Sequence, residues 1–296
     1  MAEKKARQWK GTTGGYTFGQ RAMKVIFSLM DVRFGYVILW FAVPFYMLKN
    51  HREYLAIYHY FRRQHGYPAL KSFYKTYVNH LLFGQMMMDR FAVYAGQNKF
   101  NIENPDNEIF MNRLETLNGC ILAGSHIGNP ELCGYLLKQD KKRINGMIFG
   151  GEKKEVQKNR TNVLEDNNIR VIPVLEDMSH IFLINDALSN GEIVTMPCDR
   201  TFGSDKSLEC DFLNGKADFP IGAFVLAVQY QVPVLVIFML KITTRLYRIH
   251  MTQIDLPKQT TKREQINSMT RDYAKILEDI VKKYPLQWFN FYEFWK

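Results

Sequence analysis

The sequence predicts an α/β domain with a mostly parallel central sheet flanked by helices, preceded by a helical layer. From about residue 117 onward, short apolar runs alternate with amphipathic segments, the pattern of strand–helix–strand units. Residues 1–100 instead carry aromatic and apolar side chains at helical spacing. Apolar residues make up 47% of the 296 residues and charged ones 23%, so the chain can bury a large core. We therefore expect a helical region at 1–100 and an α/β domain at 101–296.

The helical region contains an apolar run suited to a membrane surface. Residues 1–21 are polar and glycine-rich, which does not fit a signal peptide. Residues 34–48 are nearly free of polar groups, but they include Pro44 and fall short of the roughly 20 residues that cross a bilayer. Basic residues flank the run, and aromatic residues lie within it (Lys24, Arg33, Lys49, Arg52; Trp40, Phe41, Phe45, Tyr46). We expect a membrane-associating helix that lies in one leaflet; the alternative is a buried core helix.

The remaining elements follow from periodicity and from turn residues. Two more N-terminal helices are predicted at residues 50–66 and 68–96, separated by the break Gly66-Tyr67-Pro68. The predicted strands are 119–124, 144–150, 169–174, 192–197 and 233–240. The predicted helices are 130–138, 153–167, 178–191, 220–231 and 262–284, and an aromatic tail follows at 284–296. No repeat or low-complexity linker interrupts this order, so we expect one integrated α/β domain beneath the helical layer.

Charge and cysteine content narrow the function classes. The net charge is +10 with a pI of about 9.3, which favours an acidic protein or an anionic membrane as partner. Nucleic acid is disfavoured, because zinc-finger spacing, an RNP-type aromatic motif and a basic leucine zipper are all missing from the sequence. The four cysteines form no C-x-x-C pair, so we expect reduced thiols in the cytosol, with neither a metal site nor a bound cofactor.

The segment 121–132, ILAGSHIGNPEL, carries the first candidate site. His126 follows a predicted strand, where parallel sheets gather their chemistry. Asn129 suits a helix N-cap and Pro130 the first helical position, so Glu131 falls in the first helical turn, where free N–H groups hold a carboxylate ionised. Because five helical residues span about 500°, the two side chains can pair only if His126 lies in the turn. We predict a catalytic pair in which Glu131 orients the general base His126; the alternative is a structural histidine.

Other side chains are secondary candidates for substrate binding, and Asn129 is one of them in addition to its expected place at the helix N-cap. Asp199 and Arg200 follow the predicted strand 192–197, and Arg200 either binds a phosphate or carboxylate or belongs to a structural ion pair. Arg160 either binds an anion or lies on a solvated helix face. Ser125 supports His126 or lines the site, and it is not expected to be a nucleophile because the segment lacks G-x-S-x-G.

Several segments, taken in order, resemble one family. LAGSHIGNPEL resembles the "sGHxGNWE" segment of the bacterial lipid A biosynthesis (late) acyltransferases, a branch of the lysophospholipid acyltransferase superfamily with its H-x4-D/E motif, although Pro130 replaces the usual tryptophan. GEIVTMPCDRTFG is similar to a Gly-Glu, strand, Asp-Gln/Arg segment, and the block 210–235 is similar to a glycine- and alanine-containing block of that branch. YPLQWFNFYEFWK resembles the terminal "hPEQWfw-x-h-x-RfK". The likeness covers roughly residues 115–296.

The resemblance implies a glycerol-phosphate acyltransferase-like fold and an O-acyltransferase activity. An acyl group would move from a thioester, on acyl carrier protein or CoA, to a hydroxyl of a lipid acceptor without an acyl-enzyme. His126 would be the base with Glu131 as partner, and Gly215, within 212–222, would line the acyl or donor channel. The expected location is the cytoplasmic face of the inner membrane of a Gram-negative bacterium, with monotopic or peripheral attachment and contact with an anionic surface.

The acceptor stays open at this point. The segment 9–19, WKGTTGGYTFG, resembles the start of lipid A acyltransferase-like proteins from other lipid pathways. The acceptor is therefore a lipid A precursor or, alternatively, an aminolipid, glycolipid or pigment precursor. A non-catalytic lipid-binding protein that retains the fold is the alternative from a different class.

Overall fold

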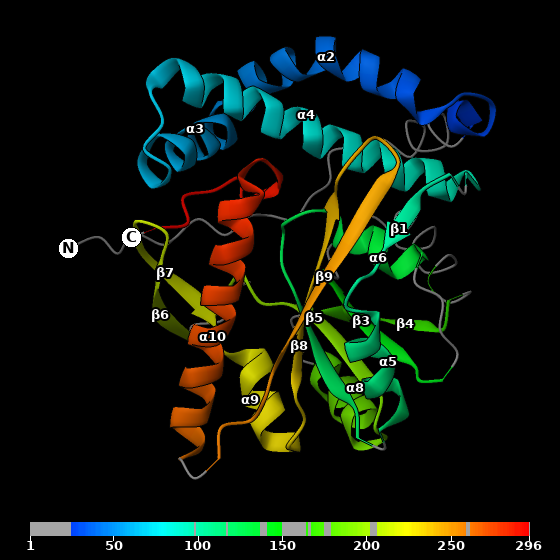
Figure 1. Ribbon diagram of the computed structural model, residues 1–296, viewed down its shortest axis with the longest axis vertical. Helices are drawn as coiled ribbons and strands as arrows, with labels where there is room; N and C mark the ends of the chain where they lie inside the picture. The colour runs from blue at the N-terminus through cyan, green and yellow to red at the C-terminus, as the bar shows by residue number, and fades with distance from the viewer. Residues whose placement is uncertain are drawn as a thin grey trace.

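The computed structural model describes residues 25–97, 99–116, 118–136, 141–149, 164, 167–174, 179–201, 206–258 and 261–295. Its centre is a seven-stranded sheet in the order β1-β9-β8-β2-β5-β3-β4 (Figure 1). The strands are β1 (Asn101–Glu103), β2 (Cys120–Gly124), β3 (Ile144–Phe149), β4 (Ile169–Val174), β5 (Ile193–Pro197), β8 (Val234–Lys241) and β9 (Leu246–Ile254). The five strands β8, β2, β5, β3 and β4 are mutually parallel, whereas β9 is antiparallel to β8. The predicted mostly parallel α/β sheet is confirmed.

The burial of the central strands explains their apolar composition. Every residue of β2 is buried, and β8 is buried except for one intermediate position, because helices or other elements cover both faces of the sheet. Continuous apolar runs of this kind are the expected signature of central parallel strands. The register pairs Gly124 of β2 with Pro197 of β5, so these neighbouring strands end at the same level. The segments that follow them therefore emerge side by side at one edge of the sheet.

Helices connect and cover these strands. They are α5 (Asn107–Glu115), α6 (Pro130–Leu136), α8 (Ser179–Ser189), α9 (Gly222–Tyr230) and α10 (Lys262–Lys283), with a short 3-10 turn at Pro285–Gln287. α10 starts at a capping box in which Thr261 and Glu264 satisfy each other's backbone N–H groups. The predicted helix 153–167 lies almost wholly outside the described residues.

Two strands, one helix and a hairpin differ from the sequence prediction. β1, β9 and helix α5 were not expected, and residues 207–220 form the antiparallel hairpin β6 (Ser207–Phe212) and β7 (Gly215–Pro220). Alternation is the physical reason in both hairpins: β9 and β6–β7 have one buried and one exposed face, so charged residues interrupt their apolar pattern. The sequence of such a strand has no continuous apolar run, so only its pairing with other strands shows that it belongs to a sheet.

A helical layer lies across the upper edge of the sheet (Figure 1). It consists of α2 (Val32–Lys49), α3 (His51–His59) with a π turn at Tyr60–Gln64, and the long helix α4 (Ala69–Tyr94). α2 begins at Asp31, whose carboxylate accepts the backbone N–H of Arg33 at 3.1 Å. The predicted helices at 50–66 and 68–96 are confirmed, with the break where Gly66-Tyr67-Pro68 stands.

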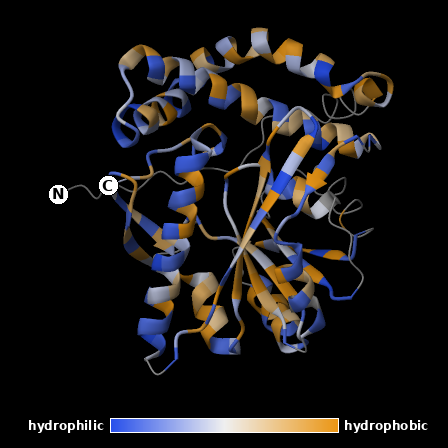
Figure 2. Cartoon of the chain, in the orientation of Figure 1, coloured by the Kyte–Doolittle hydropathy of each residue, from blue (hydrophilic) through white to orange (hydrophobic). Residues whose placement is uncertain are grey.

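α2 has one buried and one exposed face, both apolar. The buried residues recur at helical spacing and pack toward α4 (Val32, Gly35, Tyr36, Leu39, Val43, Met47). The opposite face exposes large apolar side chains (Phe34, Val37, Ile38, Trp40, Phe41, Phe45, Tyr46, Leu48). Figure 2 shows this apolar colouring along α2. By length and composition this helix could cross a membrane, and 33% of it is buried against the protein.

The face of α4 that meets the sheet is unusually polar. Ser72, Thr76, Asn79 and Asp89 are fully buried there, and His80 is nearly so. Asn79 donates its two side-chain N–H groups to the carbonyls of Leu286 and Trp288, at 3.0 and 3.1 Å. Buried polar groups of this kind need partners, and α4 supplies them to the C-terminal tail and to the strand ends. The buried side of α4 therefore combines these polar groups with the apolar side chains of Leu81, Met86 and Ala92.

Candidate functional site

His126 and Asp199 meet at the upper edge of the sheet and are joined twice. The ring atom Nδ1 of His126 lies 2.8 Å from Oδ1 of Asp199, and the backbone N–H of His126 donates to Oδ2 at 2.7 Å. Because Gly124 and Pro197 are aligned across β2 and β5, both residues stand two positions beyond paired strand ends. The Asp199 side chain is fully buried, whereas 29% of the His126 side chain is exposed. A buried acid therefore holds a ring that solvent or a substrate can reach.

The chain turns sharply after His126 because Gly128 adopts a left-handed conformation with φ of +67°. A Cβ atom there would lie 2.0 Å from the carbonyl oxygen of Met239, so no other residue fits without moving β8. The turn is fixed by backbone bonds: Gly128 donates to the carbonyl of Gln287 at 2.9 Å, and Asn129 donates to that of Met239 at 2.7 Å. The position of His126 is thereby tied to β8 and to the C-terminal tail.

The helix that follows starts as predicted. Pro130 is the first residue of α6, and Oδ1 of Asn129 accepts the backbone N–H of Leu132 at 3.4 Å, in the manner of an N-cap. Glu131 lies in the first turn of the helix. The sequence pattern Asn-Pro-Glu was therefore sufficient to place the start of this short helix.

The structure corrects the predicted partner of His126. Asp199, not Glu131, binds Nδ1 of the ring. The carboxylate of Glu131 instead accepts from two residues of α4: Nη1 of Arg90 at 2.5 Å and the hydroxyl of Tyr94 at 2.8 Å. The physical reason is the position of α4 over the turn, because its guanidinium group draws the Glu131 carboxylate towards the helical layer.

The electrostatics of the pair favour a neutral ring beside an ionised acid. Burial lowers the pKa of His126 below its usual 6.5; Asp199 opposes this shift, and the positive charges of Arg200 and Arg90 add to it. Burial alone would raise the pKa of Asp199, but the charge and hydrogen bonds of His126, together with Arg200, bring it below its usual 3.8. A neutral imidazole next to a carboxylate carries its proton on Nδ1 and a lone pair on Nε2, which is the form that accepts a proton.

Arg200 and the C-terminal tail enclose the other side of this pair. Nη2 of Arg200 donates to the carbonyl of Phe289 at 2.8 Å, and its guanidinium carbon lies 5.5 Å from the centre of the Tyr292 ring. Phe289 in turn donates its backbone N–H to the carbonyl of His126 at 3.0 Å. Asp199 contributes to raising the pKa of Tyr292, although burial is the larger cause. Both Arg200 and the tail therefore belong to the surroundings of His126.

The other predicted site residues lie in different settings. Ser125 is buried, and its hydroxyl accepts the backbone N–H of Ile127 at 3.4 Å, which is a structural contact. Asn129 is fully buried and holds the turn, as described above. Gly215 starts β7 and lies against Trp295, since a Cβ there would meet the indole at 2.7 Å. Arg160 lies outside the described residues.

Sequence reasoning missed the contribution of α4 and of the tail. Asp89 and Arg90 are adjacent charges within the apolar segment MMMDRFAVY, and such a pair signals a buried polar contact. Asp89 is fully buried and lies 2.5 Å from Nζ of Lys241, with the hydroxyls of Tyr36 and Tyr247 also donating to it. The sequence shows that these charges are unusual, but the partners of Asp89 come from three other elements, α2, β8 and β9.

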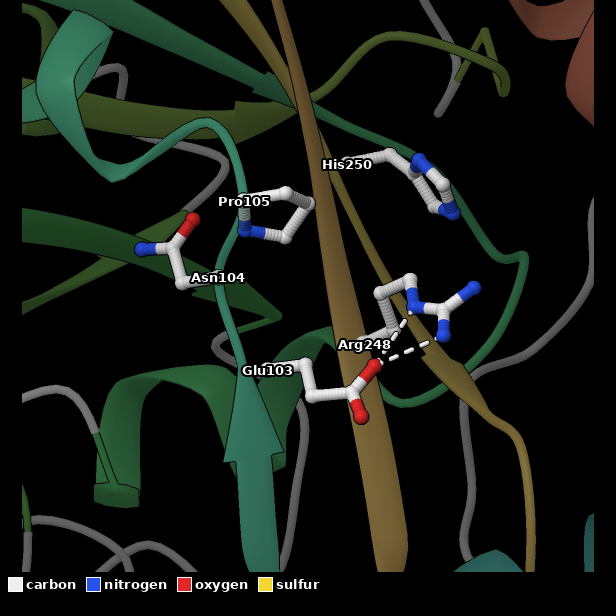
Figure 3. A pocket seen from close by; sticks show the side chains of 5 residues that line it. All are labelled: Glu103, Asn104, Pro105, Arg248 and His250. Atoms are coloured by element: carbon white, nitrogen blue, oxygen red, sulfur yellow. Dashed lines mark hydrogen bonds and ion pairs between the residues drawn. The ribbon is translucent and has the colours of Figure 1, made fainter.

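The surface carries a shallow depression away from these contacts. It is lined by Glu103, Asn104, Pro105, Arg248 and His250, on β1, β9 and the segment after β1 (Figure 3). Its central contact is an ion pair in which Nε of Arg248 donates to Glu103 at 2.8 Å. None of the predicted site residues lines it. Within the part of the chain that the structure describes, no three His, Cys, Asp or Glu side chains form a group that could hold a metal ion.

Comparison with known families decides the identity of the chain. The family described as bacterial lipid A biosynthesis acyltransferase matches residues 80–296, which include His126, Asp199 and the aromatic tail. The chain belongs to this family. The resemblance inferred from the ordered motifs is confirmed, and with it the assignment as an acyltransferase of lipid biosynthesis.

The other comparisons give less information about this member of the lipid A acyltransferase family. A search of curated proteins finds no match. Among solved structures, the 1-acyl-sn-glycerophosphate (LPA) acyltransferase PlsC from Thermotoga maritima is similar at 13% identity, over 89% of this chain and 98% of that one, with a TM-score of 0.38.

Proposed function

We propose that this family member transfers a fatty acyl group from a thioester to a hydroxyl of a lipid acceptor, with His126 as general base and Asp199 as the group that orients it. The observation that carries the proposal is the double contact between His126 and Asp199. It holds both the ring and the backbone of His126 against one buried carboxylate. A partly exposed imidazole held in this way has the geometry of a general base.

The reaction would proceed in one displacement through a tetrahedral intermediate. While the Nδ1–H group of His126 donates a hydrogen bond to Asp199, Nε2 takes the proton of the acceptor hydroxyl. At the same time the hydroxyl oxygen forms a bond to the thioester carbonyl carbon. The carbon–sulfur bond then breaks, and the leaving thiolate receives the proton from the imidazolium. Proton and electron pair balance within the two substrates, so the scheme needs no acyl-enzyme, no metal and no redox cofactor.

Arg200 is the side chain best placed to stabilise the negative charge that develops. Its Nη2 is fixed by the carbonyl of Phe289, and its positive charge acts on the His126 ring, so its guanidinium is held near the proposed base. A preorganised cation near a developing oxyanion is worth several kcal/mol, on the order of 2.7–4 for one donor. The same cation would suit a phosphate of the donor or of the acceptor headgroup.

The acceptor would reach the site from the cytoplasmic leaflet of the inner membrane. The exposed apolar face of α2 supports attachment, and its buried face supports an in-plane rather than a crossing helix. A crossing helix would have to separate Tyr36 and Leu39 from α4 and expose the polar groups beneath them. Basic side chains border the layer (Arg33, Lys49, Arg52, Arg62, Arg63, Lys71), which suits anionic headgroups.

Comparative lipidomics of a deletion strain tests the proposal and identifies the acceptor. The strain is complemented with the wild type, with His126→Ala, or with the control Asp186→Asn, which alters a largely exposed carboxylate on α8. We expect the deletion to lose one acylated lipid and to accumulate its precursor lacking that chain. The wild type and the control should restore the lipid. His126→Ala should not, because losing a general base typically costs about 10²–10⁴-fold in rate.

The lipid that disappears distinguishes the acceptor classes directly. A lipid A precursor, an aminolipid, a glycolipid and a pigment precursor differ in headgroup mass, and the missing chain gives the acyl length. Restoration by His126→Ala at wild-type level would instead support a non-catalytic lipid-binding role. Purified protein supplied with acyl carrier protein or CoA thioesters of that chain length then identifies the donor.

A further inference from the structure

Three residues on one stripe of α4 hold the turn that carries His126. Met86, Arg90 and Tyr94 are spaced four residues apart, so they lie on the same helix face. The carbonyl of Met86 accepts from Nδ2 of Asn129 at 3.3 Å. Nε of Arg90 donates to Oδ1 of the same Asn129 at 3.0 Å. Every polar atom of the Asn129 side chain is therefore engaged by α4 or by the start of α6.

Arg90 is the centre of this arrangement because it binds two residues at once, the last residue before α6 and the second residue of α6. Its Nε binds Asn129 and its Nη1 binds Glu131 at 2.5 Å, while Tyr94 binds the other oxygen of Glu131. Arg90 and Glu131 expose only 20% and 16% of their side chains, so the pair is poorly screened by solvent. A planar guanidinium that binds an amide and a carboxylate together fixes both position and orientation.

We propose that Arg90 is a positioning residue for His126, through which the membrane-facing helical layer sets the geometry of the catalytic turn. Glu131, the acid of the H-x4-E segment, serves in this arrangement as the ion-pair partner through which Arg90 positions the turn. α4 thus connects two surfaces. It packs against α2, whose outer face is apolar and exposed, and it grips the turn beside the reacting atoms. The inference rests on the proposed function only in taking His126 as the base.

The charges around His126 make the role of Arg90 measurable. Asp199 and Arg200 act on the ring from the end of β5 and Arg90 acts on it from α4, while Glu131 of α6 is paired with Arg90 and Tyr292 of the tail lies beside Arg200. Arg90 contributes to lowering the pKa of His126, after burial and Arg200. Removing Arg90 takes away that positive charge and leaves Glu131 uncompensated, so His126 should titrate at higher pH. Removing the charge of Glu131 leaves Arg90 uncompensated, so His126 should titrate at lower pH.

Four variants of the full-length protein separate these effects: Arg90→Met, Arg90→Lys, Glu131→Gln and the double variant Arg90→Met/Glu131→Gln. The control is Arg248→Met, which removes an arginine paired with Glu103 in the shallow depression of Figure 3. The first readout is the NMR titration of the His126 ring in protein labelled at histidine Cε1, assigned with His126→Ala. The second is release of free CoA thiol from palmitoyl-CoA, measured on the alkaline plateau, where His126 is neutral in every variant.

We expect opposite shifts of the His126 titration in Arg90→Met and Glu131→Gln, and a value between them in the double variant. Thiol release should fall about 10²-fold in Arg90→Met, since misplacing a catalytic group by about 1 Å costs that much. Arg90→Lys keeps the charge and loses the fork, so its titration should stay near that of the wild type while its rate falls. Arg248→Met should match the wild type in both readouts.

The proposal is overturned if the two single variants shift the titration in the same direction or leave it unchanged. It is equally overturned if Arg90→Met retains the wild-type rate while folded, as judged by its thermal unfolding. The titration does not depend on turnover, so it decides the role of Arg90 even where palmitoyl-CoA is not cleaved. A wild type that cleaves no thioester would count against the proposed function, but not against the positioning of His126 by Arg90.

Discussion

His126 and Asp199 are separated by 73 positions in the chain, yet one carboxylate of Asp199 binds both the ring and the backbone N–H of His126. The alignment of Gly124 with Pro197 across β2 and β5 brings them together. Because the second oxygen of Asp199 is occupied by the backbone of His126, the carboxylate cannot rotate freely. The ring is therefore oriented by the sheet itself, and the consequences can be measured.

Asp199→Asn should abolish most activity while leaving the fold largely intact. Asparagine has nearly the same shape, but only one of its two amide heteroatoms can accept a hydrogen bond. If its NH2 group faces Nδ1, it donates to Nδ1 and forces the ring proton to Nε2. If its oxygen faces Nδ1, the hydrogen bond from the backbone N–H of His126 is lost. The wrong tautomer cannot accept a proton from the acceptor, so we expect a loss on the order of 10⁴ in kcat, as known for an acid of this role in a triad. Steady-state thioester turnover and far-UV circular dichroism measure the two effects.

The matched control for this variant is Glu131→Gln, with both variants assayed at one alkaline pH at which His126 is neutral. Glu131 grips Arg90 and not Nδ1, so its loss should reduce the rate much less than the loss of Asp199. An equal loss in both variants would contradict the assignment of Asp199 as the orienting acid.

The activity should have an acid limb below the usual range of histidine. His126 must be neutral to act as base, and its pKa is lowered from 6.5 by burial and by two arginines, against the opposing effect of Asp199. As pH falls, kcat/KM should therefore stay level through 6.5 and decline only when pH passes through the lower pKa of the folded enzyme. A pH–rate profile with a soluble thioester measures this, and a limb at or above 6.5 would contradict the electrostatic account.

Membrane binding should depend on the outer face of α2. Phe41 and Phe45 expose 72% and 73% of their surface, so replacing both by aspartate removes apolar contact and adds repulsion from anionic lipid. We expect Phe41→Asp/Phe45→Asp to stay folded and to lose most cosedimentation with vesicles that contain anionic phospholipid. Phe182→Asp is the control, because Phe182 is 76% exposed and its helix α8 lies at the end of the sheet opposite the helical layer (Figure 1). Equal loss in the control would show that any exposed apolar residue drives binding.

The buried pair of Lys241 and Asp89 should be important for stability. Its side chains expose 4% and 0% of their surface, and the hydroxyls of Tyr36 and Tyr247 complete the hydrogen bonds. Lys241→Met leaves a buried carboxylate without its counter-charge, which costs about 3–5 kcal/mol in the free energy of unfolding. Urea unfolding measures the change. The surface variant Lys282→Met, which breaks a pair within α10, should stay within about 0.5 kcal/mol of the wild type.

Part of this arrangement could be predicted because it is local. The turn from β2 into α6 follows from Asn129, Pro130 and Glu131, since capping depends on residues within one helical turn. The central strands and the break before α4 were equally readable from apolar runs and from Gly66-Tyr67-Pro68. The edge strands β1 and β9 were not, because only their pairing partners tell which of their faces is buried.

By itself, the sequence determined the family, the alternation of parallel strands with helices, and the place of His126 just beyond a strand. These depend on local periodicity, on capping and on an ordered set of motifs. Only the tertiary structure decided which acid holds the ring. Strand order and register bring Asp199 to Nδ1, while α4 draws Glu131 away to Arg90. A hydrogen bond needs atoms within about 3 Å of each other, and sequence spacing says nothing of that distance when the partners come from different strands and helices.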